Sequence, residues 1–321
     1  MQSTYFPLSI QTPISCLKFR ASLPSVGLRR NSPLVPVSPA YASVNGTTIA
    51  QSGGNIIVKA TQSVDEIINI DEEQFDEEFL LRAGLEAERM PKHIAVIADG
   101  HRRWARQKGL PPKSGHRTLA PVYKDISRLC CKCGIKVFTA YLYSPENMKR
   151  SQEEVETIMS LFEEGIRSNM EESMRHGIRI SVIGDRTILP KSLVEAITEA
   201  EEKTKANSRL HLILAINYGG QNEILQASRK LFKKIKDGLI QEEEINIKLF
   251  EQELGTNICS KFPFPDFMIR FGGELRLSNF LSYQLAYAEL YFTNTLFPDF
   301  TEEDFIIAMK SYQKRNRRYG V

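Results

Sequence analysis

The sequence predicts an α/β fold: a single domain with a mostly parallel central β-sheet flanked by helices. Short apolar runs rich in β-branched and aromatic residues recur along the chain, and the segments between them show helical periodicity. This alternation is typical of a parallel sheet with helices on both faces, because parallel strands are usually joined by a crossover helix. We expect strands at Ile94–Ala98, Val137–Leu142, Ile180–Gly184, Leu210–Asn217 and Phe267–Arg270.

Three of the other segments carry clear helix signals. Apolar residues between positions 119 and 133 recur at the spacing of one helix face. Ser151 and Glu154 form the sequence pattern of a capping box ahead of an apolar stripe. Thr301 and Asp304 form the same pattern ahead of the last expected helix.

Length and composition favour one globular body with a tail. The chain has 321 residues, of which 42% are apolar and 25% charged, so it can bury a substantial core. The net charge of +3 does not favour a nucleic-acid partner, because five positive charges lie in the N-terminal tail. No apolar run reaches about 18 residues, so no transmembrane helix is expected. Five unevenly spaced cysteines indicate a reducing compartment rather than a disulfide framework.

The first 64 residues differ in composition from the rest of the chain. Residues 1–64 contain no Asp or Glu, are rich in Ser and Thr, and carry scattered Lys and Arg. This composition is typical of an organelle transit peptide that is disordered, and a merely disordered extension is the alternative. Residues 65–88 are interpreted as an acidic linker, and residues 89–321 as the folded domain.

A polar segment directly follows the first expected strand and reads Asp99-Gly100-His101-Arg102-Arg103-Trp104. In parallel α/β sheets, ligands bind beyond the carboxyl ends of the strands. Asp99 is therefore a candidate Mg²⁺ ligand and Arg103 a candidate clamp for diphosphate oxygens, while Gly100 allows close approach of the backbone. The alternative is a solvated basic helix that Asp99 caps.

Two further polar segments follow expected strands. Residues 144–150, Ser-Pro-Glu-Asn-Met-Lys-Arg, contain groups that could contact a substrate, but taken alone they favour a simple turn. Residues 270–280 contain two Arg, a Ser and two Gly within nine positions, which is typical of an anion site. Glu289 lies in an otherwise apolar run and needs a partner, which is either a metal ion or an arginine.

Several common enzyme motifs are absent. The sequence contains no GxxxxGK[ST], GxGxxG, HExxH or GxSxG pattern, so the usual signals for nucleotide hydrolysis, dinucleotide binding, zinc proteolysis and serine hydrolysis are missing. Cys130 and Cys133 have CxxC spacing on an apolar helical stripe without a second pair, which favours core packing over zinc or redox chemistry.

Taken together, these segments resemble the signature blocks of the cis-prenyltransferases, the undecaprenyl and dehydrodolichyl diphosphate synthase family. The resemblance covers about residues 90–320, in order and with suitable spacing, and it is most similar to a plant plastidial type. Further matching stretches are Gly115-His116-Arg117, Ile183-Gly184-Asp185-Arg186, Ala215-Ile216-Asn217-Tyr218-Gly219-Gly220, Arg276-Leu277-Ser278-Asn279-Phe280 and Gln284-Leu285-Ala286-Tyr287-Ala288-Glu289-Leu290-Tyr291-Phe292-Thr293.

The resemblance implies a Mg²⁺-dependent transferase with a hydrophobic tunnel, which condenses isopentenyl diphosphate with an allylic diphosphate to form a cis double bond. Asp99, helped by Glu289, is then expected to hold Mg²⁺, and His116 and Asn147 match positions tied to the condensation. The residues expected to bind the allylic diphosphate are Gly100, His101, Arg102, Arg103, Trp104 and Arg150. Those expected at isopentenyl diphosphate are Arg270, Arg276 and Ser278.

Some positions depart from the family pattern. His101 stands where Asn is usual, and Pro112 stands where an Arg can assist the diphosphate. Pro145 and Met148 replace a Ser or Thr and a Trp beside Glu146-Asn147, and Phe271-Gly272 stands where Thr-Ser or Thr-Gly is common.

One departure bears on the length of the product. Leu142 occupies a position usually given to Ala at the tunnel entrance, and Phe162 lies on the apolar stripe of the following helix. Bulky side chains shorten the product that a tunnel can house, so we expect a product of about C10 to C20. The alternative is that Leu142 is accommodated elsewhere and long polyprenols form.

The C-terminal Arg318-Tyr319-Gly320 resembles an element that self-sufficient family members supply across their dimer interface, which implies a homodimer. With the transit segment, the expected location is the plastid stroma. Two alternatives to regular condensation are a non-catalytic partner subunit of a prenyltransferase complex and irregular coupling of two dimethylallyl diphosphates.

Overall fold

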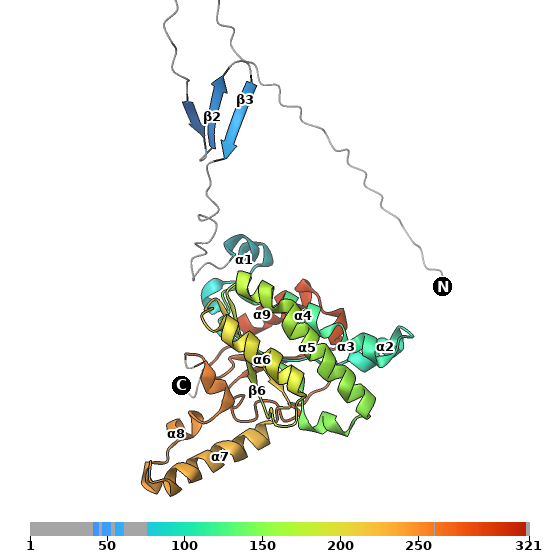
Figure 1. Ribbon diagram of the computed structural model, residues 1–321, viewed down its shortest axis with the longest axis vertical. Helices are drawn as coiled ribbons and strands as arrows, with labels where there is room; N and C mark the ends of the chain where they lie inside the picture. The colour runs from blue at the N-terminus through green and yellow to red at the C-terminus, as the bar shows by residue number, and fades with distance from the viewer. Residues whose placement is uncertain (1–40, 45–46, 53–54, 61–75, 260, 319–321) are drawn as a thin grey trace, which may run out of the picture. The chain divides into compact units, whose positions relative to one another are not determined.

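The computed structural model describes residues 41–44, 47–52, 55–60, 76–259 and 261–318. The chain divides into two compact units, residues 1–68 and residues 69–321. Figure 1 shows the described elements of both units.

The first unit contains a three-stranded antiparallel sheet in the order β1-β2-β3. Its strands are β1 (Tyr41–Val44), β2 (Thr47–Ser52) and β3 (Asn55–Ala60). The dipeptides between them in the sequence are Asn-Gly and Gly-Gly, which are typical of two-residue hairpin turns. These strands differ from the expectation that residues 1–64 are disordered. That expectation was based on the composition of the whole segment, whereas hairpin signals are dipeptides at particular positions. The transit role stays a prediction.

The second unit contains a six-stranded parallel sheet in the order β6-β7-β5-β4-β8-β9. The expected sheet and its five strands are confirmed, with ends that shift by one or two residues. In the described part of this unit, the edge strand β9 was not predicted, because its four half-buried residues lie in a short mixed run. The bounds are β4 (His93–Ile97), β5 (Val137–Tyr143), β6 (Ile178–Ile183), β7 (Leu210–Ile216), β8 (Phe267–Arg270) and β9 (Glu289–Phe292).

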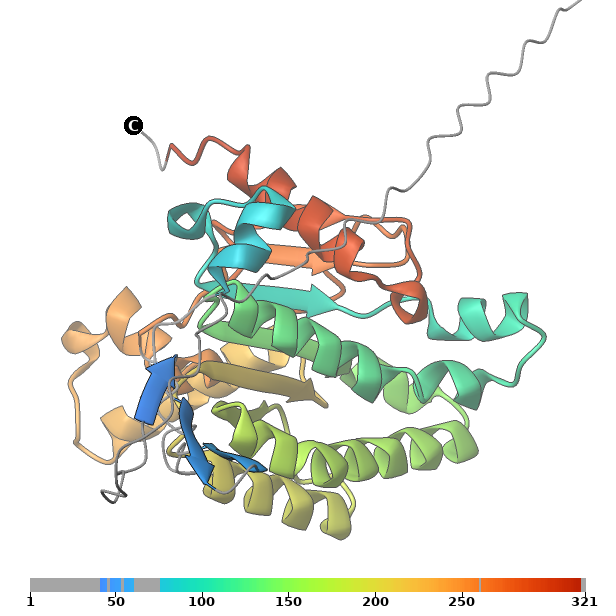
Figure 2. The same cartoon turned by 90° about the horizontal axis from the view of Figure 1, so that it is seen from above.

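Helices connect and cover these strands. The long helices α4, α5 and α6 run side by side along one face of the sheet, as Figure 2 shows. The α-helices are α1 (Glu77–Ala83), α2 (His101–Gln107), α3 (Pro112–His116), α4 (Leu119–Lys132), α5 (Gln152–Arg175), α6 (Lys191–Thr204), α7 (Gly220–Lys236), α8 (Ile247–Glu251) and α9 (Glu302–Gln313). Short 3₁₀ turns are η2 (Ala87–Arg89), η3 (Pro145–Lys149), η4 (Glu242–Glu244), η5 (Gly255–Ile258) and η6 (Phe297–Asp299).

The sheet separates two hydrophobic cores. Along β4, Ile94 and Val96 face the core that includes residues of α1, α4, α5, α6 and α9. Ala95 and Ile97 face the opposite core, which residues 280–285 help to close. Side chains alternate between the two faces because successive residues of a strand point in opposite directions. Both faces are apolar, which explains why the strands appear in the sequence as continuous apolar runs.

The folded domain begins earlier than residue 89. Within the expected acidic linker 65–88, α1 places Phe79 and Leu80 in the core, where each is at most 3% exposed. Asp76 caps the helix, with its Oδ1 accepting a hydrogen bond of 2.8 Å from the Phe79 amide. Three of the acidic residues that suggested a linker, Asp76, Glu77 and Glu78, are thus the cap and first turn of a helix, where negative charge is favourable.

The two expected capping patterns have different outcomes. At α9, Thr301 and Asp304 form a complete capping box. At α5, Ser151 caps the helix by accepting from the Glu154 amide, but the Glu154 side chain contacts other residues. Among the described residues, no helix is long and apolar enough to cross a membrane.

Candidate active site

The carboxyl ends of β4 and β8 meet at a topological switch point of the sheet. β4 lies between β5 and β8, and the chain goes from β4 to β5 and only much later to β8. Such a reversal opens a crevice beyond the carboxyl ends of the strands, where ligands bind in open α/β sheets. Asp99 follows β4 by two residues and Arg270 ends β8, so both lie at this crevice.

Asp99 is held between two arginines. Its Oδ2 is 3.0 Å from Nη2 of Arg270, and its Oδ1 is 3.2 Å from Nη2 of Arg103. Burial alone would raise the pKa of Asp99, but the hydrogen bond from Arg270 and the charges of both arginines outweigh burial, so its pKa is lowered. About a third of the side chain is exposed, and the carboxylate is therefore ionised and accessible at neutral pH.

Two glycines permit this arrangement. Gly272 has a φ of +86°, and a Cβ there would lie 2.7 Å from Nη2 of Arg103. Gly100 has a φ of +113°, and a Cβ there would lie 2.8 Å from the side chain of Leu296. Only glycine adopts these angles without strain, so the backbone requires Gly100 after Asp99 and Gly272 after β8. The freed space lets Arg103 donate a 2.7 Å hydrogen bond to the Gly272 carbonyl.

Arg270 organises the segment that follows it. The side chain is 4% exposed, and its Nη1 donates to Oγ of Ser278 at 2.7 Å and to the carbonyl of Arg276. Nε of Arg270 has no partner among the described residues. The expected contact of Arg270 with a second diphosphate stays a prediction. Arg276 is 62% exposed and pairs with Glu274, so its guanidinium is available to exchange partners.

The backbone of residues 278–281 is unusual. Ser278, Asn279 and Leu281 have φ values of +50°, +63° and +44°. Consecutive residues in this region are costly for side chains with a Cβ, and such conformations concentrate at ligand-binding sites. Oγ of Ser278 lies on this loop beside Arg270, which agrees with the expectation of an anion site.

Two residues that the sequence did not indicate as site residues, Tyr141 and Asn279, support this loop. The Tyr141 hydroxyl lies 3.2 Å from the Ser278 carbonyl. Asn279 accepts hydrogen bonds from the amides of Gly220 and Gln221 at 2.7 and 2.9 Å. These contacts join β5 and the start of α7 to the loop. Asn279 and Gly220 each lay in a matching stretch of the sequence, but neither stretch indicated that the two residues are partners.

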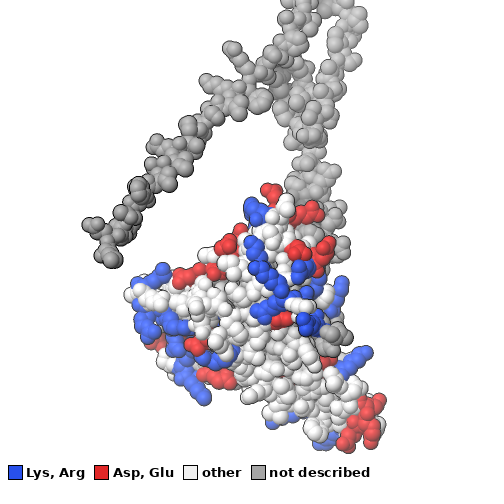
Figure 3. Space-filling model, turned by 180° about the vertical axis from the view of Figure 1, so that it is seen from behind, with Lys and Arg blue, Asp and Glu red and all other residues white. Residues whose placement is uncertain are grey.

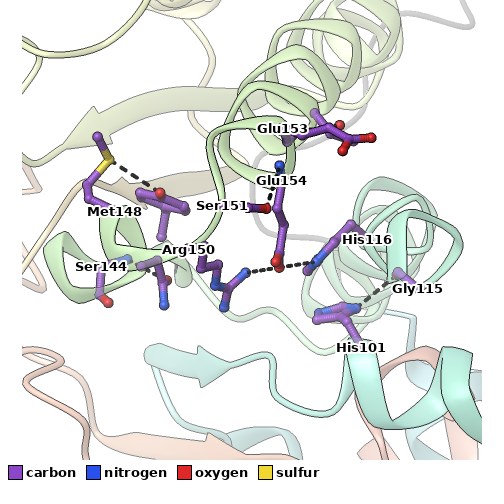
Figure 4. Close-up of polar contacts among 12 residues, drawn as sticks. His101, Gly115, His116, Ser144, Met148, Arg150, Ser151, Glu153 and Glu154 are labelled. Atoms are coloured by element: carbon purple, nitrogen blue, oxygen red, sulfur yellow. Dashed lines mark hydrogen bonds and ion pairs between the residues drawn. The ribbon is translucent and has the colours of Figure 1, made fainter. Parts of the chain in front are cut away.

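A second polar cluster lies next to α2, and Figure 4 shows it. Oε1 of Glu154 accepts from Arg150 at 3.1 Å and is 3.3 Å from Nε2 of His116. Nδ1 of His101 is 3.0 Å from the Gly115 carbonyl, and the two imidazole rings are 5.6 Å apart. Glu154 was expected only to cap α5, because no local pattern indicates a partner on a distant helix.

Both imidazoles in this cluster are neutral at physiological pH. Burial lowers the pKa of His101 to about 4, with a further contribution from the neighbouring His116. Burial also lowers the pKa of His116, and this effect outweighs the hydrogen bond to the Glu154 carboxylate, which raises it. Nε2 of His101 is buried without a partner among the described residues. Since Nδ1 of His101 faces a carbonyl and must carry the proton there, Nε2 is a free acceptor.

The remaining predicted residues on this edge have local partners. Oδ1 of Asn147 accepts a 3.0 Å hydrogen bond from the Ser144 amide, which forms the turn that the sequence alone favoured. Nε1 of Trp104 donates to Asp299 at 2.7 Å and holds α2 against η6. Arg102 is exposed on α2. The role of Asn147 in condensation stays a prediction.

Glu289 does not share a site with Asp99 within one chain. It is the first residue of β9 and pairs with Phe267 at the start of β8, whereas Asp99 contacts Arg270 at the end of β8. Three residues of strand separate these positions, which is roughly 10 Å. Oε2 of Glu289 pairs with Arg315 at 2.8 Å. The expectation that Glu289 helps Asp99 to hold Mg²⁺ stays a prediction, and the partner that the described chain gives Glu289 is Arg315.

A cavity of about 390 Å³ lies beside the second polar cluster. It extends between α4 and α5 over the sheet, and His116 lines it near the carboxyl ends of the strands. Both predicted chain-length residues, Leu142 at the end of β5 and Phe162 on α5, also line it. The structure thus places a long apolar space next to the charged edge of the sheet.

The Asp99 carboxylate fits Mg²⁺. This ion is usually bound by one or two carboxylates together with substrate phosphates and several waters. Asp99 is ionised and partly exposed, and each of its oxygens keeps a lone pair beyond the contact with an arginine. Among the described residues, no three His, Cys, Asp or Glu side chains form a complete metal cluster.

Comparison with known proteins agrees with this geometry. The family described as "Putative undecaprenyl diphosphate synthase" matches residues 97–320. The chain belongs to this family of cis-prenyltransferases. This cis-prenyltransferase is 54% identical over 234 residues to the chloroplastic (2Z,6Z)-farnesyl diphosphate synthase CPT6 of Solanum lycopersicum, covering 73% of the chain and 80% of the relative.

Two other relatives differ in the products they are named for. The cis-prenyltransferase is 48% identical over 245 residues to dehydrodolichyl diphosphate synthase 2 of Arabidopsis thaliana, covering 76% of the chain and 79% of the relative. Lavandulyl diphosphate synthase from Lavandula x intermedia, solved with dimethylallyl diphosphate, superposes with a TM-score of 0.71 at 43% identity. That match covers 73% of the chain and all of the solved structure.

Proposed function

We propose that this cis-prenyltransferase condenses isopentenyl diphosphate with dimethylallyl diphosphate, or another short allylic diphosphate, to a short Z-configured prenyl diphosphate. The observation that supports this most directly is the junction of two surfaces. Arg103 and Asp99 lie at a charged sheet edge, and His116 begins an apolar cavity beside it. A molecule with an anionic head and a branched hydrocarbon tail matches both surfaces.

Each part of the charged edge has a proposed role. Arg102, Arg103 and Arg150 bind the diphosphate of the allylic substrate, since guanidinium groups match phosphate oxygens in geometry and charge. Asp99 is the proposed Mg²⁺ ligand, and the ion, when bound, stabilises the negative charge that develops on a departing diphosphate. Arg276 and Ser278 are proposed to bind the diphosphate of isopentenyl diphosphate on the other side of the crevice, with Arg270 holding their loop.

The bond changes follow from the proposed substrates. The allylic C–O bond breaks, and its electron pair leaves with the diphosphate. The alkene of isopentenyl diphosphate then supplies the electron pair for the new C–C bond, and loss of a proton forms the new double bond. His116 and Asn147 are proposed to lie near this centre. A neutral imidazole or a diphosphate oxygen accepts the proton, and the low pKa of His101 and His116 leaves both rings unprotonated.

A short product is proposed from the size of the cavity and its walls. Its volume of about 390 Å³ is near the lower end of the range of small-molecule pockets, roughly 300 to 1,000 Å³. The side chains of Leu142 and Phe162 are part of its walls. The purified chain, incubated with Mg²⁺, dimethylallyl diphosphate and isopentenyl diphosphate, is expected to release products of about C10 to C20. Predominant chains of C50 or longer in the chromatogram would contradict this proposal.

Irregular coupling of two dimethylallyl diphosphates is a second candidate, favoured by the 43% identity to lavandulyl diphosphate synthase. Deuterated isopentenyl diphosphate separates the two reactions. Regular condensation places the label in every product, whereas irregular coupling leaves the product unlabelled. A non-catalytic subunit is disfavoured, because Asp99, Arg103 and Arg276 are all present at the crevice.

We further propose a homodimer, on the basis of an exposed apolar surface on α7 and its neighbours. Leu225, Phe232, Leu239 and Ile247 are each 49% or more exposed. Figure 3 shows that Lys and Arg gather at the end of the molecule that carries α2, while much of the surface toward the α7–α8 end is uncharged. Light scattering is expected to give twice the chain mass, and Phe232→Glu is expected to yield monomers. The C-terminal element that suggested a dimer includes Tyr319 and Gly320, which lie outside the described residues.

A plastid location is proposed for the mature protein. The tomato relative CPT6 is named chloroplastic, and residues 1–64 have the composition of a transit segment. Import of the full chain into isolated chloroplasts, with loss of an N-terminal piece, is the expected result. A chain that stays outside at full length would contradict it.

A further inference from the structure

A basic segment extends from the charged sheet edge beyond the residues that have a proposed role at the substrates. Residues 100–124 contain seven Lys or Arg and no Asp or Glu. Figure 2 shows that α2 and α3 project from the side of the domain. Arg106 lies six positions after Gly100, the N-cap of α2, which is about 9 Å of helix. The far end of α2 is therefore separate from the carboxylate of Asp99.

Residues 106–113, at this projecting end, are called the basic tip, and all eight are exposed. Its three cations are Arg106, Lys108 and Lys113. None of them forms an ion pair with an acidic side chain in the described part of the chain. Lys108 instead lies over the ring of Trp104 at 5.2 Å. Figure 3 shows Lys and Arg gathered at this end of the molecule. The tip thus presents positive charge to the solvent without neighbouring negative charge to balance it.

An apolar turn lies between these cations. Leu110 is 42% exposed, and Pro111 and Pro112 beside it are exposed as well. Gly109 has a φ of +66°, and the amide of Leu110 donates to the carbonyl of Ala105 at 2.8 Å, so the turn is a regular end of α2. Proline has no amide N–H. The turn can therefore enter an apolar environment without burying an unpaired backbone donor.

We propose that the basic tip docks the enzyme on an anionic lipid surface. The cations contact the headgroups, and Leu110 enters the outer part of the apolar layer. Lys and Arg near an anionic bilayer each favour binding, and exposed apolar side chains among them add to it. A nucleic acid or an acidic protein would also match the charge. The apolar turn favours lipid, since it offers few groups that hydrogen-bond to a polar partner.

The position of the tip gives this docking a consequence. Lys113 is three residues before His116, which lines the cavity. An enzyme docked through the tip therefore holds this side of the cavity near the lipid surface. Under the proposed function the product has an anionic head and a hydrocarbon tail, and such a molecule can pass into the lipid. This consequence rests on the proposed function, whereas the docking itself does not.

The test measures binding of the full-length protein to sedimenting vesicles without substrates. One set is phosphatidylcholine alone, and the other contains about one third phosphatidylglycerol. Wild type is expected to bind the anionic vesicles more tightly. Arg106→Gln/Lys108→Gln is expected to lower this binding about 25-fold, because each cation near the surface contributes a factor of about five. Equal binding of wild type to both vesicles would overturn the proposal, as would equal binding of the two proteins to anionic vesicles.

The apolar part of the proposal is tested at Leu110 with two variants that keep the charge. Leu110→Ser is expected to weaken binding to the anionic vesicles about fivefold, since less apolar surface leaves water. Leu110→Trp is expected to strengthen it about fivefold, since Trp is favoured at membrane interfaces. Identical binding of wild type and both variants would overturn the insertion of Leu110.

A matched control removes two cations at the same spacing elsewhere. Lys203 pairs with Glu199 at 2.7 Å, and Lys205 pairs with Glu202. Lys203→Gln/Lys205→Gln is expected to leave vesicle binding unchanged, because neighbouring carboxylates already balance these charges. A loss as large as that of Arg106→Gln/Lys108→Gln would overturn the proposal by showing that net charge alone governs binding. The cations of residues 1–64 are the same in all variants, so the ratios between variants isolate the tip.

This proposal and the proposed function can fail separately. Vesicle binding is measured without Mg²⁺ or diphosphates, so it does not depend on what the enzyme makes. Wild type that binds anionic vesicles through the tip but makes no Z-prenyl diphosphate contradicts only the proposed function. Wild type that makes short products but binds both kinds of vesicle equally contradicts only the docking. Circular dichroism of each variant checks that the fold is retained.

Discussion

The two ends of the cavity region carry the same chemical group in different surroundings. At the sheet edge, Asp99 lies between Arg103 and Arg270. At the far end, Glu172 lies between Lys124 and Arg128. Arg270 is 4% exposed, whereas the partners of Glu172 are 34% and 48% exposed. A carboxylate paired with two cations therefore does not by itself indicate a function. The role of such a group also depends on how deeply its partners are buried and on which substrate group lies next to it.

Loss of the carboxylate at the sheet edge should have the largest effect. Asp99→Asn keeps the shape but removes the charge that would hold Mg²⁺, and we expect kcat to fall about 10²- to 10³-fold, as for other groups that stabilise developing charge. Steady-state kinetics at saturating Mg²⁺ measure this. Glu172→Gln, the equivalent change at the other end, is expected to keep kcat within about threefold of wild type, since Glu172 pairs with Lys124 and Arg128 and not with the groups at the sheet edge, and a small surface change costs about 0.5 kcal/mol or less. Similar losses of kcat in both variants would remove the distinction between the two ends.

Removal of a cation should separate the two ends by stability. Arg270→Met leaves a largely buried carboxylate without its main partner and breaks the contacts with Ser278, so we expect a loss of about 3 kcal/mol in the free energy of unfolding. Arg128→Met removes a half-exposed partner and should cost at most about 1 kcal/mol. Urea unfolding of both variants gives the comparison. Equal losses in the free energy of unfolding of the two variants would show that the burial of Arg270 does not determine its contribution to stability.

The buried imidazole beside the sheet edge should make stability depend on pH. The pKa of His101 is lowered to about 4 in the folded chain, below its ordinary value of 6.5. The unfolded chain therefore takes up the proton first as pH falls, so stability present above pH 6.5 is lost between pH 6.5 and 4, by about 3 kcal/mol. In His101→Asn this part of the pH dependence should disappear. The free energy of unfolding of wild type and His101→Asn is measured at pH 7 and at pH 4.5. The difference between the two proteins in the change with pH gives the contribution of His101, because the other buried histidines are present in both proteins. An identical pH dependence of the two proteins would contradict the assignment.

Widening the wall should have the smallest effect. Leu142→Ala removes a half-buried side chain from the cavity lining, and we expect a loss of about 2 kcal/mol in the free energy of unfolding with a modest shift toward longer products. Product chromatography and urea unfolding measure the two parts. An unchanged product distribution in this variant would show that Leu142 does not limit chain length.

Local signals were sufficient for much of the fold and for part of the site. The apolar runs predicted five strands, because a strand buried on both faces needs continuous apolar residues. The placement of Asp99 and Arg103 followed from a general rule on the carboxyl ends of parallel strands. By contrast, residues 65–88 were interpreted as an acidic linker, because acidic residue types are common both in solvated segments and at the start of helices. Asp76 is in fact the cap of α1.

Other features depended on partners far away in the chain. Glu154 looked like a capping residue, and its contact with His116 exists only because α3 and α5 meet. Glu289 looked like a metal ligand, but strand register places it at the other end of the sheet, beside Arg315. Arg270 was predicted to bind a diphosphate, and the sequence did not show that its guanidinium also contacts Ser278 on its own loop.

The sequence by itself determined the alternation of strands and helices, the family, and the types of side chain available at the sheet edge. These features depend on the residue pattern of short segments, so they do not require knowledge of distant parts of the chain. Only the tertiary structure decided which charges pair with each other and which side chains line the apolar cavity. The physical reason is that burial, register and helix packing set the distance and the dielectric between groups, and those two quantities decide what a charged side chain does.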